Sequence, residues 1–108
     1  MSEVVELTED NFDEVVLRSQ IPVLIDFWSP TCGPCRALVP ILEELAHENG
    51  DLALIAKVNV FECTAIAGKY GVSMLPTILF FLNGTVAQRM VGVQSKDKLQ
   101  EALDELED

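Results

Sequence analysis

A run of six residues, Val23–Trp28, leads into a Cys-Gly-Pro-Cys tetrad at residues 32–35. The run is apolar apart from Asp26, which is typical of a central strand covered on both faces of a parallel sheet. The residues that follow, Pro34–His47, have the periodicity of a helix. The two cysteines are therefore expected where a strand ends and a helix begins. The positive end of the helix dipole stabilises a thiolate there, and the thiolate is the nucleophile in disulfide exchange.

Length and charge limit the classes of protein that the chain can represent. It has 108 residues, 49% of them hydrophobic, and a net charge of −11 at pH 7. This length predicts one compact domain covering residues 1–108. The negative charge argues against nucleic acid and anionic membranes as partners. No stretch is apolar over the ~18–20 residues that span a membrane, and the N-terminus lacks the features of a secretory signal. We therefore expect a cytoplasmic monomer.

The charges are unevenly distributed along the chain. Six acids lie in residues 3–14 and six more in residues 97–108, whereas residues 27–42 carry one charged side chain, Arg36. Most of these acids are interpreted as solvated helix faces that keep the protein soluble. The scarcity of charge around the cysteine pair favours a surface on which varied protein partners dock.

The cysteine count separates a redox site from a structural one. The chain has three cysteines. An odd number in a reducing compartment argues against a framework of structural disulfides, and a close pair there is more often catalytic or metal-binding. A structural zinc site usually takes four Cys or His ligands, and only Cys63 and His47 remain to complete one, in no recognised spacing. A redox pair is favoured, and Cys63 is interpreted as a small apolar core residue.

Periodicity and turn signals predict the element order βαβαβαββα. A first strand near Val4–Leu7 leads into a helix at about Glu9–Arg18, with Thr8 as its N-cap. Pro40 falls inside the helix Pro34–His47 and is expected to kink it. Alternating early elements predict a parallel core, with an antiparallel hairpin at its edge. The other predicted elements are strands at 23–28, 53–58, 77–82 and 85–91, a short helix at 63–70 and a last helix capped by Ser95.

Motifs along nearly the whole chain match one known pattern. Asp26-Phe27-Trp28 precedes the tetrad, Arg36 follows it, and Leu75-Pro76-Thr77 lies about forty residues downstream. In these motifs the chain resembles the thioredoxin family, and together they are far more specific than a lone C-x-x-C. The other matching pieces are Ala56-Lys57-Val58-Asn59-Val60, Tyr70-Gly71-Val72, Asn83-Gly84 and Val91-Gly92.

The resemblance implies a fold and an activity. The fold is α/β, a thioredoxin fold in which four helices flank a five-stranded mixed sheet. The activity is that of a protein-disulfide reductase with no bound cofactor, because a reversible Cys32–Cys35 disulfide carries the electrons. The implied partners are client proteins that bear disulfides and a thioredoxin reductase, an NADPH-dependent flavoprotein that recharges the pair.

The resemblance also implies a role for each residue around the pair. Cys32 is expected to be the attacking nucleophile and Cys35, facing inward, the resolving thiol. Burial of Asp26 in its apolar strand would raise its pKa and let it take a proton from Cys35 near neutrality; an exposed, hydrated Asp26 is the alternative. Lys57, in the neighbouring strand, is the expected partner of Asp26. Pro34 has no amide hydrogen to donate to a Cys32 thiolate.

A docking surface for clients is implied around the cysteines. Leu75–Pro76 is expected to be a cis peptide beside the pair, which leaves the Met74–Leu75 backbone to pair with an extended client peptide. Trp28 is interpreted as a wall of the site rather than as plain core. The residues expected to contact clients are Trp28, Thr31, Gly33, Pro34, Met74, Leu75, Pro76 and Gly92.

Two residues depart from the family pattern. Thr31 stands where a second tryptophan usually precedes the first cysteine, so the docking surface has lost an aromatic ring. Phe61 replaces an Asp that commonly supports the active-site tryptophan, so Trp28 is expected to lack its usual hydrogen-bond acceptor. Both changes indicate a divergent member of the family.

Other functions stay open beside the reductase. The same fold can serve as an oxidase or isomerase, against which the Gly-Pro interior of the tetrad and the lack of a secretory signal argue. A non-catalytic, thioredoxin-like interaction subunit of a larger complex is favoured only by the changed residues at the rim. A zinc-binding domain is the third alternative.

Overall fold

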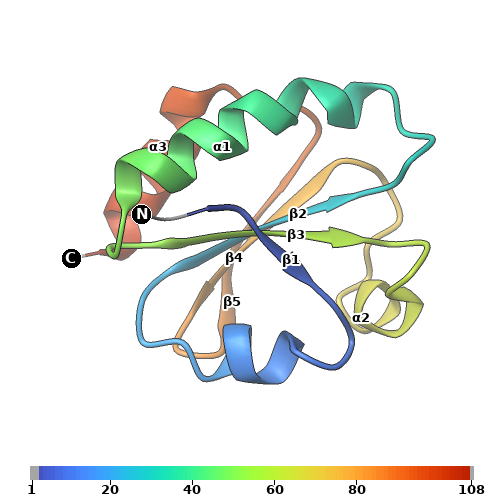
Figure 1. The fold of residues 1–108 in the computed structure, drawn as a ribbon, viewed down its shortest axis with the longest axis horizontal. Coiled ribbons are helices and arrows are strands. Elements are labelled where there is room, and N and C mark those ends of the chain that lie inside the picture. The colour runs from blue at the N-terminus through green and yellow to red at the C-terminus, as the bar shows by residue number, and fades with distance from the viewer. Residues whose placement is uncertain (1–2, 108) are drawn as a thin grey trace.

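The computed structural model of the protein describes residues 3–107. At its centre is a five-stranded sheet in the order β1-β3-β2-β4-β5 (Figure 1). The parallel strands are β1 (Val5–Leu7), β3 (Leu54–Asn59) and β2 (Val23–Trp28). The antiparallel strands are β4 (Thr77–Leu82) and β5 (Thr85–Val91). The predicted parallel core with an antiparallel edge is confirmed.

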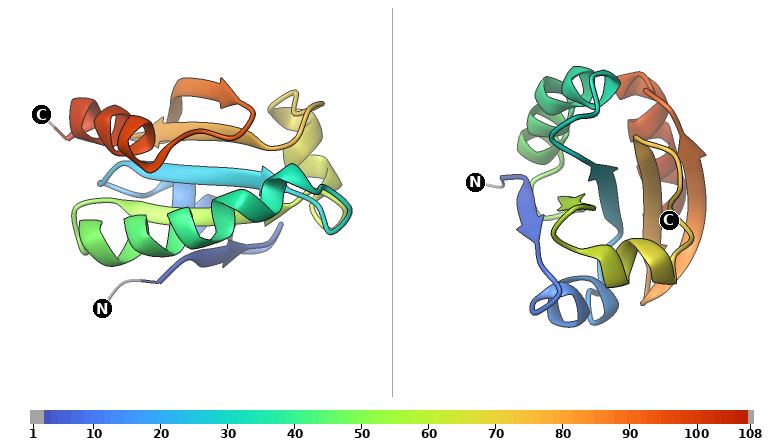
Figure 2. Two further views of the ribbon diagram at one scale, coloured as in Figure 1. Left: turned by 90° about the horizontal axis from the view of Figure 1, so that it is seen from above. Right: turned by 90° about the vertical axis from the view of Figure 1, so that its right-hand side faces the viewer.

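Helices cover both faces of the sheet. α1 (Leu38–Asn49) and α3 (Lys96–Leu106) lie on one face, whereas α2 (Thr64–Lys69) and the π-helical turn η1 (Asp13–Leu17) lie on the other (Figure 2). A single 3-10 turn, η2 (Pro34–Ala37), leads into α1. Within residues 3–107 no helix has both the length and the apolar character to cross a membrane. A five-stranded mixed sheet flanked by four helical segments is the fold that the resemblance implied.

An apolar cluster fills each side of the sheet, and β2 contributes to both. Leu24 packs in the cluster beneath α1 and α3, whereas Ile25 and Phe27 belong to the cluster beneath η1 and α2. This division follows from the alternation of side chains along a strand. The same alternation places Asp26 on the Leu24 side, among residues that α1 covers. A strand covered on both faces must be apolar almost throughout, which explains its sequence.

The first helix differs from its prediction. Thr8 and Asn11 do form a capping box: Thr8 N–H donates to Asn11 Oδ1 at 2.7 Å, and Asn11 N–H donates to Thr8 Oγ1 at 3.1 Å. The chain then winds more widely than an α-helix, since Arg18 N–H donates to Asp13 O five residues back. The Thr8–Asn11 bonds therefore close the turn before η1, whose N-cap position is Phe12, and the predicted helix Glu9–Arg18 was wrong in its N-cap and in its extent.

The helix after the tetrad also differs. A continuous helix kinked at Pro40 was expected, but η2 ends at Ala37 and α1 begins at Leu38. Pro40 thus falls in the first turn of α1, where a missing amide hydrogen removes no helical hydrogen bond. The helix type thus changes between Ala37 and Leu38, and the kink at Pro40 stays a prediction. β1 begins one residue later than predicted, β3 and α2 differ from prediction by one residue at each end, and the bounds of β2, β4 and β5 are as predicted.

Candidate active site

The two cysteines of the tetrad lie between the end of β2 and the start of α1. They form a disulfide, with Cα atoms 5.4 Å apart. Cys35 is 4% exposed, whereas Cys32 is half-buried. The sulfur that an approaching partner can reach is therefore that of Cys32, which is the geometry required of an attacking and a resolving thiol.

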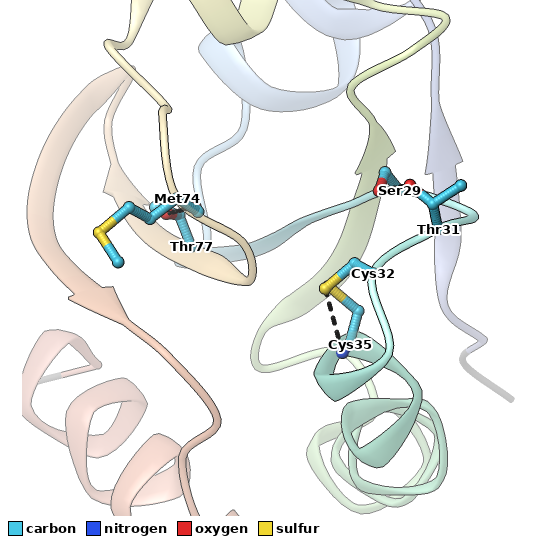
Figure 3. The surroundings of a disulfide bond; sticks show 6 residues. All are labelled: Ser29, Thr31, Cys32, Cys35, Met74 and Thr77. Atoms are coloured by element: carbon cyan, nitrogen blue, oxygen red, sulfur yellow. Dashed lines mark hydrogen bonds between the residues drawn. A yellow bond between two sulfur atoms is a disulfide. The ribbon is translucent and has the colours of Figure 1, made fainter.

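A backbone amide is directed at the exposed sulfur. Cys35 N–H donates a hydrogen bond to Cys32 Sγ at 3.3 Å (Figure 3). Sequence reasoning had identified Pro34 as a non-donor and missed this amide, which comes next along the chain. A donor in this position stabilises negative charge on the sulfur and adds to the dipole of the helical turn. Reduced Cys32 is thereby able to carry a thiolate.

Asp26 is buried on the α1 side of β2, with 2% of its surface exposed. Its Oδ1 has no hydrogen-bond partner among the residues that the structure describes. Burial raises the pKa of Asp26 from 3.8 to about 7, against the opposing effect of the positive charge on Lys57. The predicted burial of Asp26 and the resulting rise in its pKa are confirmed, and the exposed alternative is wrong.

Lys57 lies beside Asp26 in the register of β2 and β3, but its ammonium group has other contacts. Lys57 Nζ is 3.5 Å from Glu6 Oε1 and 5.3 Å from the centroid of the Trp28 ring. Among residues 3–107 the ion pair of Lys57 is with Glu6 and not with Asp26. Lys57 therefore acts on Asp26 through its charge, without a direct contact.

A cavity of about 200 Å³ connects these groups. Asp26, Lys57 and both cysteines line it, and Trp28 and Leu42 supply apolar walls. The carboxyl of Asp26 and the buried side of the disulfide thus open onto one space. A cavity of this size, with the polar groups of Asp26 and Lys57 in its otherwise apolar lining, has room for a water molecule that relays a proton.

Trp28 is half-buried and forms a wall of this cavity, as predicted. Its indole Nε1 is buried without a hydrogen-bond partner in the described part of the chain. Phe61, where the family commonly has an Asp, is 60% exposed and offers no side-chain oxygen. The expected loss of the acceptor for Trp28 is confirmed.

The residues predicted to contact clients surround the disulfide. Thr31, Gly33 and Pro34 are exposed beside it, and Thr31 Oγ1 lies 3.4 Å from Ser29 Oγ. Across from the disulfide is the loop that precedes β4, and on it Met74 is 65% exposed (Figure 3). The rim is thus built from two loops that are distant in sequence.

The loop before β4 is tied to the end of β5. The Leu75–Pro76 peptide is cis, as the resemblance implied. Pro76 O accepts a hydrogen bond of 2.8 Å from the amide of Gly92. The Thr77 hydroxyl donates to Met74 O at 2.5 Å. These bonds bring Gly92 into the same rim as Pro76.

Glu6 is the residue of this region that sequence reasoning missed. It was counted only among the acids of residues 3–14. Its significance depends on the pairing of β1 with β3, which places Glu6 opposite Lys57. An acid in one predicted strand and a base in another are a weak signal until the strand order is known.

Cys63 lies apart from the pair. It is 2% exposed, and its Sγ donates to Leu7 O at 3.7 Å. Burial raises the pKa of its thiol, so Cys63 packs as the apolar residue that was predicted. Within the described residues, no three His, Cys, Asp or Glu side chains gather as ligands for a metal ion. The zinc alternative gains no support.

Comparisons with known proteins agree with this geometry. The family model for thioredoxin matches residues 3–105. The chain is 39% identical to "Thioredoxin 1" of Synechococcus elongatus, over 96% of this chain and 97% of that protein. It is 42% identical to "Thioredoxin" of Haemophilus influenzae, over 92% of each. It is also 36% identical to "Thioredoxin M-type, chloroplastic" of Spinacia oleracea, over 96% of this chain and 58% of that protein.

Proposed function

We propose a specific role for each active-site residue of this chain. The chain belongs to the thioredoxin family and is a thiol–disulfide oxidoreductase that reduces protein disulfides. The Cys32 thiolate attacks one sulfur of a client disulfide, which forms a mixed disulfide and releases the other client sulfur as a thiolate. Cys35 then attacks Cys32 Sγ, which forms the Cys32–Cys35 disulfide and releases the second client sulfur. The client gains two electrons and the cysteine pair loses two.

Asp26 is the proton acceptor for the second step. The Cys35 thiol must lose its proton before it attacks, and Asp26 receives that proton directly or through a water molecule in the shared cavity. The released client thiolate takes up a proton in turn. The pKa of Asp26 at about 7 supports this role, because the carboxyl is then a base of suitable strength near neutrality. Lys57 is its electrostatic partner. The observation that carries the proposal is that the buried Asp26 and the buried Cys35 line the same cavity.

The rim around the disulfide binds the client. An extended client peptide pairs with the backbone of Met74–Leu75 and contacts the exposed residues Thr31, Gly33 and Pro34 across the gap. Trp28 and Gly92 complete this surface, and the buried Pro76 contributes through the backbone carbonyl that accepts from Gly92. The exposure of Met74 and the scarcity of charge near Cys32 support docking of varied clients.

A thioredoxin reductase returns the pair to the dithiol by donating two electrons. The chain acts as a single-domain monomer without a bound cofactor, and we place it in the cytoplasm. A reducing compartment suits a disulfide reductase. Location varies among its relatives, since the Spinacia protein is named as chloroplastic.

The reduction potential of the Cys32–Cys35 couple tests the proposal. Trp28 fluorescence in graded thiol buffers, checked by mass after alkylation, follows the couple. A potential near the ~−270 mV of thioredoxins, with turnover by a thioredoxin reductase, is expected. A potential of ~−180 to −120 mV would instead assign oxidising or isomerising work. The lack of any reversible two-electron couple would leave the chain an interaction subunit.

A further inference from the structure

Glu6, Lys57 and Asp26 form a row across three adjacent strands. Glu6 of β1 is opposite Lys57 of β3, and Lys57 is opposite Asp26 of β2. One ammonium group thus stands between two carboxyl groups, one on each side. Its ion pair is with Glu6, at 3.5 Å.

Trp28 contributes to the position of Lys57. Trp28 follows Asp26 by two residues on β2, so both side chains lie on the same face of the sheet. Lys57 Nζ lies 5.3 Å from the centroid of the Trp28 ring, within the range of a cation–π contact. The ammonium is therefore held between the Glu6 carboxylate and an aromatic ring.

We propose that Glu6 is a positioning residue for the reaction: its carboxylate holds Lys57 over Trp28, away from Asp26, and so keeps Asp26 a good proton acceptor. This inference rests on the role proposed above for Asp26. The Glu6 side chain is 49% exposed and Asp26 only 2%, so the Glu6 carboxyl group is in contact with solvent while that of Asp26 is enclosed. Without Glu6, the nearest carboxyl group in the row is that of Asp26.

The expected consequence is a change in the basicity of Asp26. If Lys57 moved toward Asp26, its charge would favour the carboxylate and lower the pKa of Asp26. The charge that already opposes the raised pKa is that of Lys57. β4 presents Ile78 opposite Asp26, and it has no charge. The charged or titratable groups around the cavity are Glu6 of β1, Lys57 of β3, Cys32 beside η2, Cys35 and Arg36 of η2 and Glu43 of α1.

The test is a titration of Asp26 in the full oxidised chain, in which Cys32 and Cys35 do not titrate. The ¹³C resonance of the Asp26 carboxyl reports its midpoint directly. We expect Glu6→Gln to lower that midpoint by about half a pH unit, the effect of a partly exposed charge pair. Glu43→Gln removes one negative charge from the wall of the same cavity and serves as the matched control, with a shift less than half as large.

A Lys57→Met background distinguishes the positioning of Lys57 by Glu6 from the direct effect of the Glu6 charge on Asp26. In Lys57→Met, the change Glu6→Gln is expected to lose most of its effect, because no ammonium remains to be released. An unchanged midpoint in the wild-type background would overturn the inference. Equal shifts in both backgrounds, or an equal shift in Glu43→Gln, would also overturn it.

Kinetics distinguish this inference from the proposed function. The rate at which Cys35 resolves a mixed disulfide is measured against pH for the wild type and Glu6→Gln. A rate profile that moves with the Asp26 midpoint supports both proposals. A midpoint that shifts while the profile stays unchanged supports the positioning by Glu6 and refutes the role of Asp26 as proton acceptor.

Discussion

Cys35 directs its backbone amide at the sulfur of Cys32, 3.3 Å away. Because this donor belongs to the main chain, replacing the Cys35 side chain leaves it in place. We predict that Cys35→Ser keeps a reactive Cys32 but accumulates the mixed disulfide with a client, since the resolving thiol is gone. Non-reducing electrophoresis and intact mass measure the adduct. Cys32→Ser is the control, and an adduct of equal yield with that variant would contradict the assignment of the nucleophile.

Stability is predicted to depend on pH through Asp26. Its pKa is about 7 in the folded chain and 3.8 as the unperturbed value, so between these values the folded state binds more protons. The free energy of unfolding therefore falls as pH rises through that interval, by roughly 4 kcal/mol in total.

Asp26→Asn removes this dependence, since an amide does not ionise. The variant is expected to be more stable than the wild type above pH 7 and close to it below pH 4. Denaturant unfolding over this range, followed by Trp28 fluorescence, measures the difference. If the free energy of unfolding depended on pH in the same way in both proteins, Asp26 would not be the group that causes the pH dependence.

Phe61→Asp is predicted to supply the acceptor that Trp28 Nε1 lacks. A hydrogen bond to this buried donor is expected to raise the free energy of unfolding by about 1 kcal/mol. The ¹H–¹⁵N resonance of the indole should move downfield in the same variant. Phe61→Ala removes the exposed ring without adding an oxygen and serves as the control. Equal stability in Phe61→Asp and Phe61→Ala would show that no such bond forms.

Gly84→Ala is predicted to be more destabilising than Gly71→Ala. Both glycines have positive φ, +83° and +65°, so each substitution incurs a backbone cost of about 1–2 kcal/mol. A Cβ on Gly84 would also lie 2.8 Å from Leu17 O, whereas nothing lies within 4 Å of one on Gly71. We expect this clash to add about 1–3 kcal/mol, measured by thermal or denaturant unfolding. Equal losses would mean that the hairpin relaxes away from Leu17.

Sequence predicts those elements whose signals are local. Asn83-Gly84 placed the hairpin and Ser95 placed the start of α3, because a tight turn and an N-cap are set by the residues that form them. The extent of the first helix was wrong because hydrogen bonds five residues apart compete there with those of an α-helix. Capping residues do not reveal that competition.

In the site, too, the features with local signals were predicted and those that depend on long-range pairing were not. The cysteine pair, the burial of Asp26 and the unpaired Trp28 Nε1 follow from motif positions and from one substitution, Phe61. The contacts of Lys57 with Glu6 and Trp28 depend on the order and register of three strands. Long-range pairing of this kind leaves no mark in local sequence, so Lys57 was predicted as the partner of Asp26 and its ion pair with Glu6 was missed.

Because Cys63 is buried, the rate at which its thiol is labelled measures how often the fold opens around it. Only the Cys32 thiol of the reduced pair is available to a labelling reagent in the native state, since Cys35 is 4% exposed and Cys63 2%. Labelling of Cys63 therefore requires that β1, whose Leu7 carbonyl accepts from Cys63 Sγ, separate from the start of α2. In an oxidised sample Cys32 and Cys35 are already bonded and do not react with the reagent. The label on Cys63 then reports this opening motion alone.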